Sequence, residues 1–242
     1  MATWMFAGHL LMGSAQLASY VYRLIKPHKI AIFGPSLAGK TTLDQYLTVP
    51  GDIDPIPLEL RTTHPVKNGS FQMPHATKKQ VRWKGERTPI MTTDIGGQSQ
   101  YWNLWAEDMI KRKTSVVFFV VDERVGWSQP AMQEAVAGFK YLTDIIVNHK
   151  FPGTFSRSMK KKARNYKPKV VCLVLNKMDL WWGSESQQMW DMGLKRQHPM
   201  VIPFQEDMRR LRRAAVATNV EAMAAQYGIN VEGAVIRTIN MI

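Results

Sequence analysis

The sequence contains one cysteine, Cys172, among its 242 residues. One cysteine cannot form a disulfide framework or a cysteine-based zinc site, so a reducing compartment is expected. Internal repeats and low-complexity segments are also missing. Hydrophobic residues make up 45% of the chain and charged residues 21%, which excludes a disordered chain, a collagen-like repeat and a polytopic membrane protein. The length fits one large domain or two small ones.

Acidic residues are scarce, because 19 Asp and Glu stand against 32 Lys and Arg, and the formal net charge is +13. This surplus predicts an anionic partner without choosing among nucleic acid, membrane, nucleotide and acidic protein. No acidic residue lies between Asp144 and Asp179. That gap holds a dense basic cluster: Arg157, Lys160, Lys161, Lys162, Arg164, Lys167 and Lys169. A second cluster, in a stretch predicted to be helical, consists of Arg209, Arg210, Arg212 and Arg213.

Each basic cluster has a plain interpretation as a solvated loop or helix face. For the first cluster, which we place in an insertion over residues 150–168, the main alternative is a loop held against an anionic membrane surface or an acidic partner protein. Nucleic acid is the weakest choice. Only Phe151, Phe155 and Tyr166 interleave with the basic residues, and no motif of a nucleic-acid-binding module occurs.

The N-terminal 22 residues carry no Lys, Arg, Asp or Glu, and basic residues follow directly. We expect an apolar helix near residues 4–24, within a segment over residues 1–28 that stands apart from the globular domain. Polar residues dilute it as a membrane-spanning helix, so a membrane interface or a partner protein is favoured for residues 1–25. A helix packed on the chain's own domain is the remaining alternative. We expect a cytoplasmic protein, peripheral at the cytoplasmic face of a membrane if this helix binds lipid.

A glycine-rich loop follows a short apolar strand at residues 29–33 and precedes a helical stretch at 40–47. The loop reads Gly34-Pro35-Ser36-Leu37-Ala38-Gly39-Lys40-Thr41-Thr42. This is the complete G-x-x-x-x-G-K-[ST] pattern in its required context. Glycines let successive backbone N–H groups point at phosphates, and the helix N-terminus adds partial positive charge. We predict a P-loop nucleotide site in which Lys40 reaches the β- and γ-phosphates and the Thr41 hydroxyl binds Mg²⁺.

The identity of the nucleotide is indicated by a second motif. Residues 169–175 form a continuous apolar run, typical of a buried parallel strand. The run ends in Asn176-Lys177-Met178-Asp179. A carboxylate at this place can accept hydrogen bonds from the N1–H and 2-amino groups of guanine, whereas adenine lacks this pair of donors. The N-K-x-D tetrapeptide therefore predicts a guanine nucleotide.

A third motif, Asp94-Ile-Gly-Gly97-Gln98, follows a predicted strand at residues 88–93. Asp94 would hold Mg²⁺ through water, the Gly97 N–H would sense the γ-phosphate, and Gln98 would orient the attacking water.

Together the three motifs resemble the small GTPases of the Ras superfamily, nearest the ADP-ribosylation-factor (Arf) and signal-recognition-particle-receptor β branch. Leu104-Trp105 follows the third motif at the interval that Arf proteins show, and the strand-like residues 117–122 are similar to theirs. The resemblance covers about residues 29–242. Ala224-Ala225-Gln226 stands where the family has S-A-K, so the Ala225 N–H is expected to meet the guanine O6.

The resemblance implies GTP/GDP and Mg²⁺ as ligands and slow intrinsic hydrolysis of GTP. The γ-phosphate would order residues of about 60–78 and 94–105, where effector proteins would bind. Ser36 and Leu37 depart from the small residues that many relatives carry there, so hydrolysis is expected to differ. The alternative function is an assembly subunit whose bound nucleotide is structural and rarely hydrolysed.

The first switch segment lacks a clean T-x-G signature. The Mg²⁺-binding threonine is therefore Thr62, Thr63 or Thr77, and Thr63 is favoured because it closes an Arg-Thr-Thr run. Arg61 then resembles the cis arginine of heterotrimeric Gα subunits, which stabilises transition-state charge. A solvated loop arginine is the simpler alternative for Arg61.

The expected fold class is α/β, a three-layer P-loop NTPase (G-domain) fold with a six-stranded, mostly parallel sheet and one antiparallel edge strand. The chain would be a single G domain over residues 29–242 with the basic insertion 150–168 and a helical insertion 181–213. Strands are expected near residues 29–33, 78–84, 88–93, 115–121, 169–175 and 217–222. Helices are expected near 40–47, 99–110, 129–148, 203–214 and 230–240, with further ones at 4–24 and 186–192.

Overall fold

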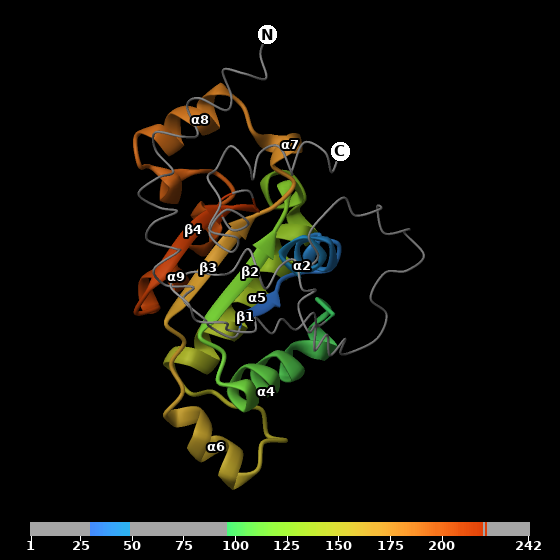
Figure 1. Ribbon diagram of the computed structural model, residues 1–242, viewed down its shortest axis with the longest axis vertical. Helices are drawn as coiled ribbons and strands as arrows, with labels where there is room; N and C mark the ends of the chain where they lie inside the picture. Colours follow the sequence, from blue (N-terminus) through green and yellow to red (C-terminus); the bar gives the residue numbers. More distant parts are fainter. Residues whose placement is uncertain (1–29, 49–95, 220, 222–242) are drawn as a thin grey trace, which may run out of the picture.

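The computed structural model describes residues 30–48, 96–219 and 221. Its strands form one parallel sheet in the order β1-β2-β3-β4 (Figure 1). They are β1 (Ile30–Phe33), β2 (Val116–Val121), β3 (Val170–Leu175) and β4 (Ala214–Thr218). An α/β fold with a parallel sheet is thus confirmed. The expected strands 78–84 and 88–93, which would bring the antiparallel edge, lie outside the described residues.

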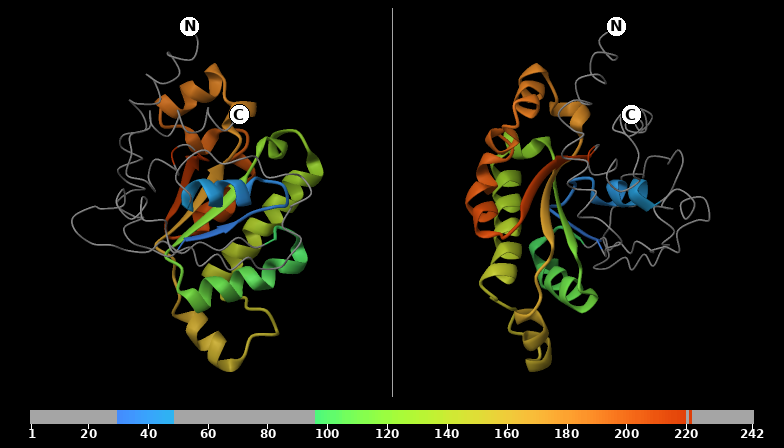
Figure 2. Two further views of the ribbon diagram at one scale, coloured as in Figure 1. Left: turned by 45° about the vertical axis from the view of Figure 1, so that its right-hand side comes forward. Right: turned by 60° about the vertical axis from the view of Figure 1, so that its left-hand side comes forward.

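The sheet is buried on both faces. Every residue of β1, β2 and β3 is buried, as expected for continuous apolar runs in a parallel sheet. Figure 2 shows α5 (Gln129–Val147) and α9 (Gln205–Arg210) on one face and α2 (Lys40–Thr48) on the other. Because all four strands run parallel, their carboxyl ends meet at one edge of the sheet, between the helical layers.

Aromatic rings fill the layer between the sheet and α4 (Trp102–Arg112) and α5. Trp105 is fully buried and stacks on Phe33 with a centroid distance of 5.2 Å. Phe119 of β2 contacts Trp105 edge-on at 6.2 Å and Phe139 of α5 at 5.1 Å. Such pairs add to the energy of apolar burial, so this ladder fixes α4 and α5 against β1 and β2.

Helices α2, α4 and α5 agree with the expected helices at 40–47, 99–110 and 129–148. α4 is preceded by a 3₁₀ turn, η2 (Ser99–Tyr101), and ends at Lys113, which has a left-handed backbone with φ +53°. α5 begins after Ser128, whose hydroxyl accepts a hydrogen bond from the Ala131 N–H. The expected helices 4–24 and 230–240 lie outside the described residues.

Helix α6 (Arg157–Arg164) occupies the basic segment and was not expected as a helix. Ser156 caps it, because its hydroxyl accepts a hydrogen bond from the Met159 N–H at 3.1 Å. Ala163 is buried and Met159 half-buried, whereas most of the cationic side chains are exposed. Two small or flexible apolar residues four apart are a weak periodic signal, which the surrounding charge hides.

Residues 181–213 fold into short helices: α8 (Ser184–Asp191), η4 (Lys195–Gln197), η5 (Ile202–Phe204) and α9. The helix expected near 203–214 is wrong in its end. α9 stops at Arg210, because Leu211 is buried with an extended backbone and β4 begins at Ala214. Phe204 packs on Phe139 of α5 at 5.4 Å, which joins this segment to the main core.

The strand expected at 217–222 is also wrong, because β4 ends at Thr218. A capping box stops it there: the Glu221 N–H donates to Thr218 Oγ1 at 3.1 Å and the Thr218 N–H donates to Glu221 Oε2 at 2.9 Å. Asn219 and Glu221 are already helical. The T-x-x-E spacing of residues 218–221 is the signal that could have predicted this boundary.

Within the described ranges, no helix combines the length and the hydropathy that crossing a lipid bilayer requires.

Candidate nucleotide site

The glycine-rich loop joins β1 to α2 and lies against the ends of two other strands. Gly34 has φ +144°, and a Cβ there would lie 2.1 Å from the Val120 carbonyl oxygen. Gly39 has φ +79°, and a Cβ there would lie 2.3 Å from Asn176 Nδ2. Both positions therefore require glycine. The loop is wrapped closely against β2 and the end of β3.

The groups of the loop that were expected to bind phosphate lie at the N-terminus of α2. Lys40 is buried, and its Nζ donates a 2.7 Å hydrogen bond to the Pro35 carbonyl. Thr41 and Thr42 are half-buried in the first turn of α2. The first N–H groups of a helix have no partner inside the helix, so this end carries donors and partial positive charge. A glycine-containing loop that ends in a helix N-terminus, with a lysine bonded across it, fits a phosphate chain.

The N-K-x-D residues lie at the same edge of the sheet. Asn176 Nδ2 donates to the Ala38 carbonyl at 2.8 Å, a buried bond that ties the loop after β3 to the glycine-rich loop. Lys177 has φ +52° and precedes α7 (Met178–Trp181). Asp179 is exposed in the first turn of α7, and no hydrogen bond or ion pair from the described residues reaches its carboxylate.

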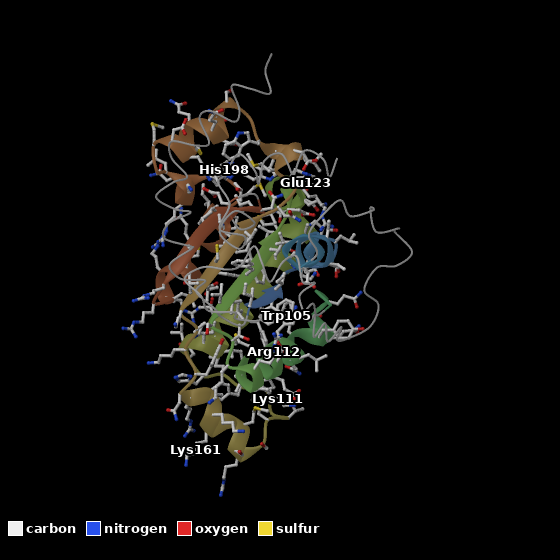
Figure 3. The ribbon with its side chains drawn as sticks, in the orientation of Figure 1. Trp105, Lys111, Arg112, Glu123, Lys161 and His198 are labelled. Atoms are coloured by element: carbon white, nitrogen blue, oxygen red, sulfur yellow. The ribbon has the colours of Figure 1, made fainter. Side chains whose placement is uncertain are left out.

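The double glycine of the third motif touches the glycine-rich loop. A Cβ on Gly97 would lie 2.4 Å from both Pro35 C and Ser36 N. The indole N–H groups of α4 hold this contact: Trp102 Nε1 donates to Gly97 O and Trp105 Nε1 donates to Gly96 O, each at 3.1 Å. Figure 3 labels Trp105 where α4 meets the sheet. The backbone carbonyls of the double glycine are thus held by the indole N–H groups of two tryptophans of α4.

Gln98 points away from this contact. Its side chain is exposed, and its Oε1 accepts a hydrogen bond from Gln100 Nε2 at 2.8 Å. The expected water-orienting role therefore requires a different rotamer from the one described.

Two charged residues at the glycine-rich loop were not predicted. Arg124, after β2 in η3 (Glu123–Gly126), donates from its guanidinium to the Ser36 carbonyl at 2.7 Å. Glu134 of α5 accepts a hydrogen bond from the Ser36 N–H at 3.3 Å. Ser36 is therefore held through both of its backbone groups. No sequence signal predicts these contacts, because they join segments about a hundred residues apart.

Asp122 connects these groups to the N-K-x-D residues. It directly follows β2, is only 1% exposed, and accepts hydrogen bonds from Arg124 Nε at 3.0 and 2.9 Å. Lys177 Nζ lies 2.8 Å from the same carboxylate and 3.6 Å from Glu123, which Figure 3 labels beyond β2. A buried carboxylate needs such partners. A polar residue directly after a buried strand is the signal that could have identified it.

The helical segment 181–213 contacts the N-K-x-D residues. Trp181 Nε1 donates to the Asn176 carbonyl at 2.8 Å. Beside it, Leu175 of β3 pairs with Thr218 of β4, so the loops after the two strands are neighbours. Glu221 is fully buried and accepts hydrogen bonds from Lys195 Nζ at 2.7 Å and from Trp190 Nε1 at 3.3 Å.

Several expected site residues cannot be placed against this geometry. Arg61, Thr63, Asp94, Ala224, Ala225 and Gln226 lie outside the described residues. Because β4 ends at Thr218, the chain leaves this edge at Asn219, which is already helical, some residues before Ala224.

No family model matches the chain, and no curated protein matches it in sequence. Among solved structures, it is similar to the Arl6 (BBS3) small GTPase from Trypanosoma brucei with a bound nucleotide analogue. The identity is 14% and the TM-score 0.46, over 87% of this chain and 98% of that one. The small COPII coat GTPase SAR1 from Encephalitozoon cuniculi, in complex with GDP, is 17% identical with a TM-score of 0.37, over 99% of this chain and 92% of that one.

A bacterial selenocysteine-specific elongation factor, EF-Sec, is 16% identical with a TM-score of 0.42 over 90% of this chain, which spans 29% of that factor's length. At these low identities and scores the likenesses carry no assignment of function. What supports the function proposed below is the set of contacts among the chain's own loops.

Proposed function

We propose that this chain is a guanine-nucleotide-binding switch that hydrolyses GTP to GDP and phosphate. The observation that carries the proposal is the buried 2.8 Å hydrogen bond from Asn176 to the Ala38 carbonyl. It fixes a loop suited to phosphates beside a tetrapeptide suited to guanine, at the strand edge where α/β sheets bind ligands. Segments that are far apart in the sequence thus form one site.

At the phosphate end, the backbone N–H groups of the glycine-rich loop and Lys40 Nζ bind the β- and γ-phosphates. Lys40 is already oriented by the Pro35 carbonyl. Thr41 would hold Mg²⁺ together with Thr63 and, through water, Asp94. The metal ion, when bound, neutralises charge on the β- and γ-phosphate oxygens.

At the base end, the Asp179 carboxylate accepts hydrogen bonds from N1–H and the 2-amino group of guanine. Its exposure, and the lack of a partner among the described residues, leave both oxygens available. Asp122 and Trp181 keep the preceding backbone in place through Lys177 and Asn176. Adenine leaves this carboxylate unpaired, and the loss of such a bond discriminates strongly between ligands.

The γ-phosphate signal would pass through Gly97, which lies against the glycine-rich loop. Gln98 turns from Gln100 toward the nucleotide to orient water, and Arg61 adds positive charge in the transition state. Residues 60–78 and 94–105 become ordered when the γ-phosphate is bound, and an effector binds them in this ordered form. Turnover without an added activating protein is slow.

The guanine assignment is tested with Asp179→Asn. The substitution exchanges an acceptor for a donor at the base, so it should shift preference from GTP toward xanthosine triphosphate. A variant that hydrolyses GTP with unchanged preference over xanthosine triphosphate contradicts the assignment.

A second function is an assembly subunit whose nucleotide is structural and rarely hydrolysed. The Gln98 side chain, which the switch needs to orient water, is exposed and bonded to Gln100 instead. Single-turnover phosphate release from the parent and from Gln98→Leu separates the two functions. Release from the parent that Gln98→Leu abolishes supports the switch, and no release from the parent supports the assembly subunit.

A further inference from the structure

The two basic clusters of the sequence meet at the edge of the sheet opposite the nucleotide site. A pocket of about 380 Å³ lies where β3 and β4 begin and α5 ends. Its basic lining residues come from both clusters: Lys167, Lys169, Arg210, Arg212 and Arg213. β3 is six residues long, so this pocket is roughly 17 Å from the loop that follows β3. It is therefore separate from the nucleotide site.

The pocket has a rigid frame. Arg210 lies between two carboxylates: it pairs with Asp144 of α5 at 2.5 Å and with Asp207 of α9. Burial alone would raise the pKa of Asp144, but the Arg210 hydrogen bond and the charge of Lys150 hold this pKa below its ordinary value. Arg210 and these carboxylates thus offset one another and join α9 to α5.

Three other cations of the lining are not offset by a described carboxylate. Lys167, Arg212 and Arg213 are exposed, and within the described ranges no carboxylate pairs with them. The backbone is held at two of the basic lining residues, because the Val171 N–H donates to the Arg213 carbonyl at 3.1 Å and the Lys169 N–H donates to the Ser115 carbonyl at 2.7 Å. Fixed cations around one pocket create a local positive potential that focuses anions.

Helix α6 extends this positive charge. Figures 1 and 2 both place α6 at the same end of the molecule, beyond the start of β3, and Figure 3 shows Lys161 on it. The aromatic residues nearby do not offer a stacking surface, since Phe155 and Tyr166 are buried and Phe151 is half-buried. Single-stranded nucleic acid, which binds by stacking on exposed rings, is therefore disfavoured.

The lining beneath the basic rim is apolar and includes Ile146, Val171 and Leu211. A cationic rim over an apolar floor, in a volume at the low end of small-molecule sites, suits a compact ring that carries phosphates. Adjacent arginines can bind phosphate oxygens in a bidentate manner. We propose that this pocket binds a small polyol with two or more phosphate groups, as a free anion or as the headgroup of a phosphorylated lipid.

The test is calorimetric titration of the full chain, with GDP and Mg²⁺ present, by inositol trisphosphate at physiological ionic strength. Arg212→Gln with Arg213→Gln removes two cations of the rim and should weaken binding about tenfold or more. Arg157→Gln with Arg164→Gln is the matched control, because it removes the same charge from α6 outside the pocket lining and should weaken binding far less. The thermal unfolding temperature of both variants should equal that of the parent.

A second arm separates the two sources of phosphate. Co-sedimentation with phosphatidylcholine vesicles, with and without phosphatidylinositol bisphosphate, shows whether the headgroup is bound in a bilayer. Binding of the trisphosphate alone identifies a free anion, and added vesicle binding that the pocket variant loses identifies the lipid. The proposal is overturned if both double variants weaken binding equally, if the parent binds neither probe, or if a DNA duplex of equal charge binds the parent as tightly. None of these outcomes depends on nucleotide binding at the other edge.

Discussion

Adding one methyl group to Gly97 should push the double glycine away from the glycine-rich loop. A Cβ there would lie 2.4 Å from Pro35 C and from Ser36 N, and 2.5 Å from Gly34 O. Carbon atoms in contact are normally separated by about 3.5–4.0 Å, so the segment must retreat by about 1 Å. The glycine-rich loop cannot yield instead, because Gly34 is already against the Val120 carbonyl.

The retreat has two measurable effects. It stretches the hydrogen bond from Trp102 Nε1 to Gly97 O, now 3.1 Å. Loss of one such bond and overpacking together should lower the free energy of unfolding by about 1–3 kcal/mol. It also moves the Gly97 N–H from the proposed γ-phosphate position. The affinity for a non-hydrolysable GTP analogue should fall about tenfold, corresponding to one lost hydrogen bond, while the affinity for GDP is retained.

The assay is tryptophan fluorescence of the parent and of Gly97→Ala during titration with GDP and with the GTP analogue. Gly126→Ala is the matched control, because its Cβ would meet only Met200 Cγ at 3.8 Å. Urea unfolding gives the stability of each variant. If Gly97→Ala matches the Gly126→Ala control in stability and binds both nucleotides as the parent does, Gly97 does not contact the glycine-rich loop in the way described here.

Three further predictions concern stability. Asn176→Ala leaves the buried Ala38 carbonyl without its donor, so urea unfolding should show a loss of about 1–3 kcal/mol, and an unchanged midpoint would contradict the bond between the two loops. Leu37 is 48% exposed and has φ +66°, a left-handed backbone that strains any residue with a Cβ. Leu37→Gly should therefore be neutral or stabilising by up to about 1 kcal/mol, whereas the β-branched Leu37→Val should lower the melting temperature. The opposite order of stabilities would refute backbone strain at this position. Burial lowers the pKa of His198 below its ordinary 6.5, against the smaller opposing effect of Glu185. The unfolded chain therefore takes up the proton first as the pH drops. The contribution of His198 to stability is complete above pH 6.5 and is lost progressively below it. Melting temperatures between about pH 7.5 and 5.5 should show this slope in the parent and a shallower one in His198→Gln, and equal slopes would exclude His198 as the cause.

Apolar runs made most of the sheet predictable. β1, β2 and β3 fall within one residue of the bounds expected for them, because each is buried on both faces and is an uninterrupted apolar segment in the sequence. The bounds of β4 were predicted wrongly for two reasons. Its alanines do not differ enough in β-propensity from the residues of α9 to mark where the strand begins, and the capping box at Thr218 and Glu221 starts a helix where a strand was expected to continue. α6 was missed because its inward face is only Met159 and Ala163.

Motif spacing predicted which loops could form a site, and the structure brings the described ones together. It could not predict how those loops are held. Arg124 of η3 and Glu134 of α5 form hydrogen bonds with Ser36, and Trp102 of α4 forms one with Gly97. These bonds depend on the angles at which helices pack on the sheet, which follow from the filled aromatic layer rather than from any local pattern.

Competition between nucleotides tests the central proposal most directly. With a fluorescent GDP bound to the parent chain in the presence of Mg²⁺, unlabelled GDP should displace it, xanthosine diphosphate should do so much less well, and ADP should not. Asp179→Asn should reverse the order of GDP and xanthosine diphosphate, because the base-reading carboxylate becomes an amide. Equal displacement of the probe by GDP and ADP, or failure of the parent to bind the probe at all, would contradict a guanine-nucleotide site.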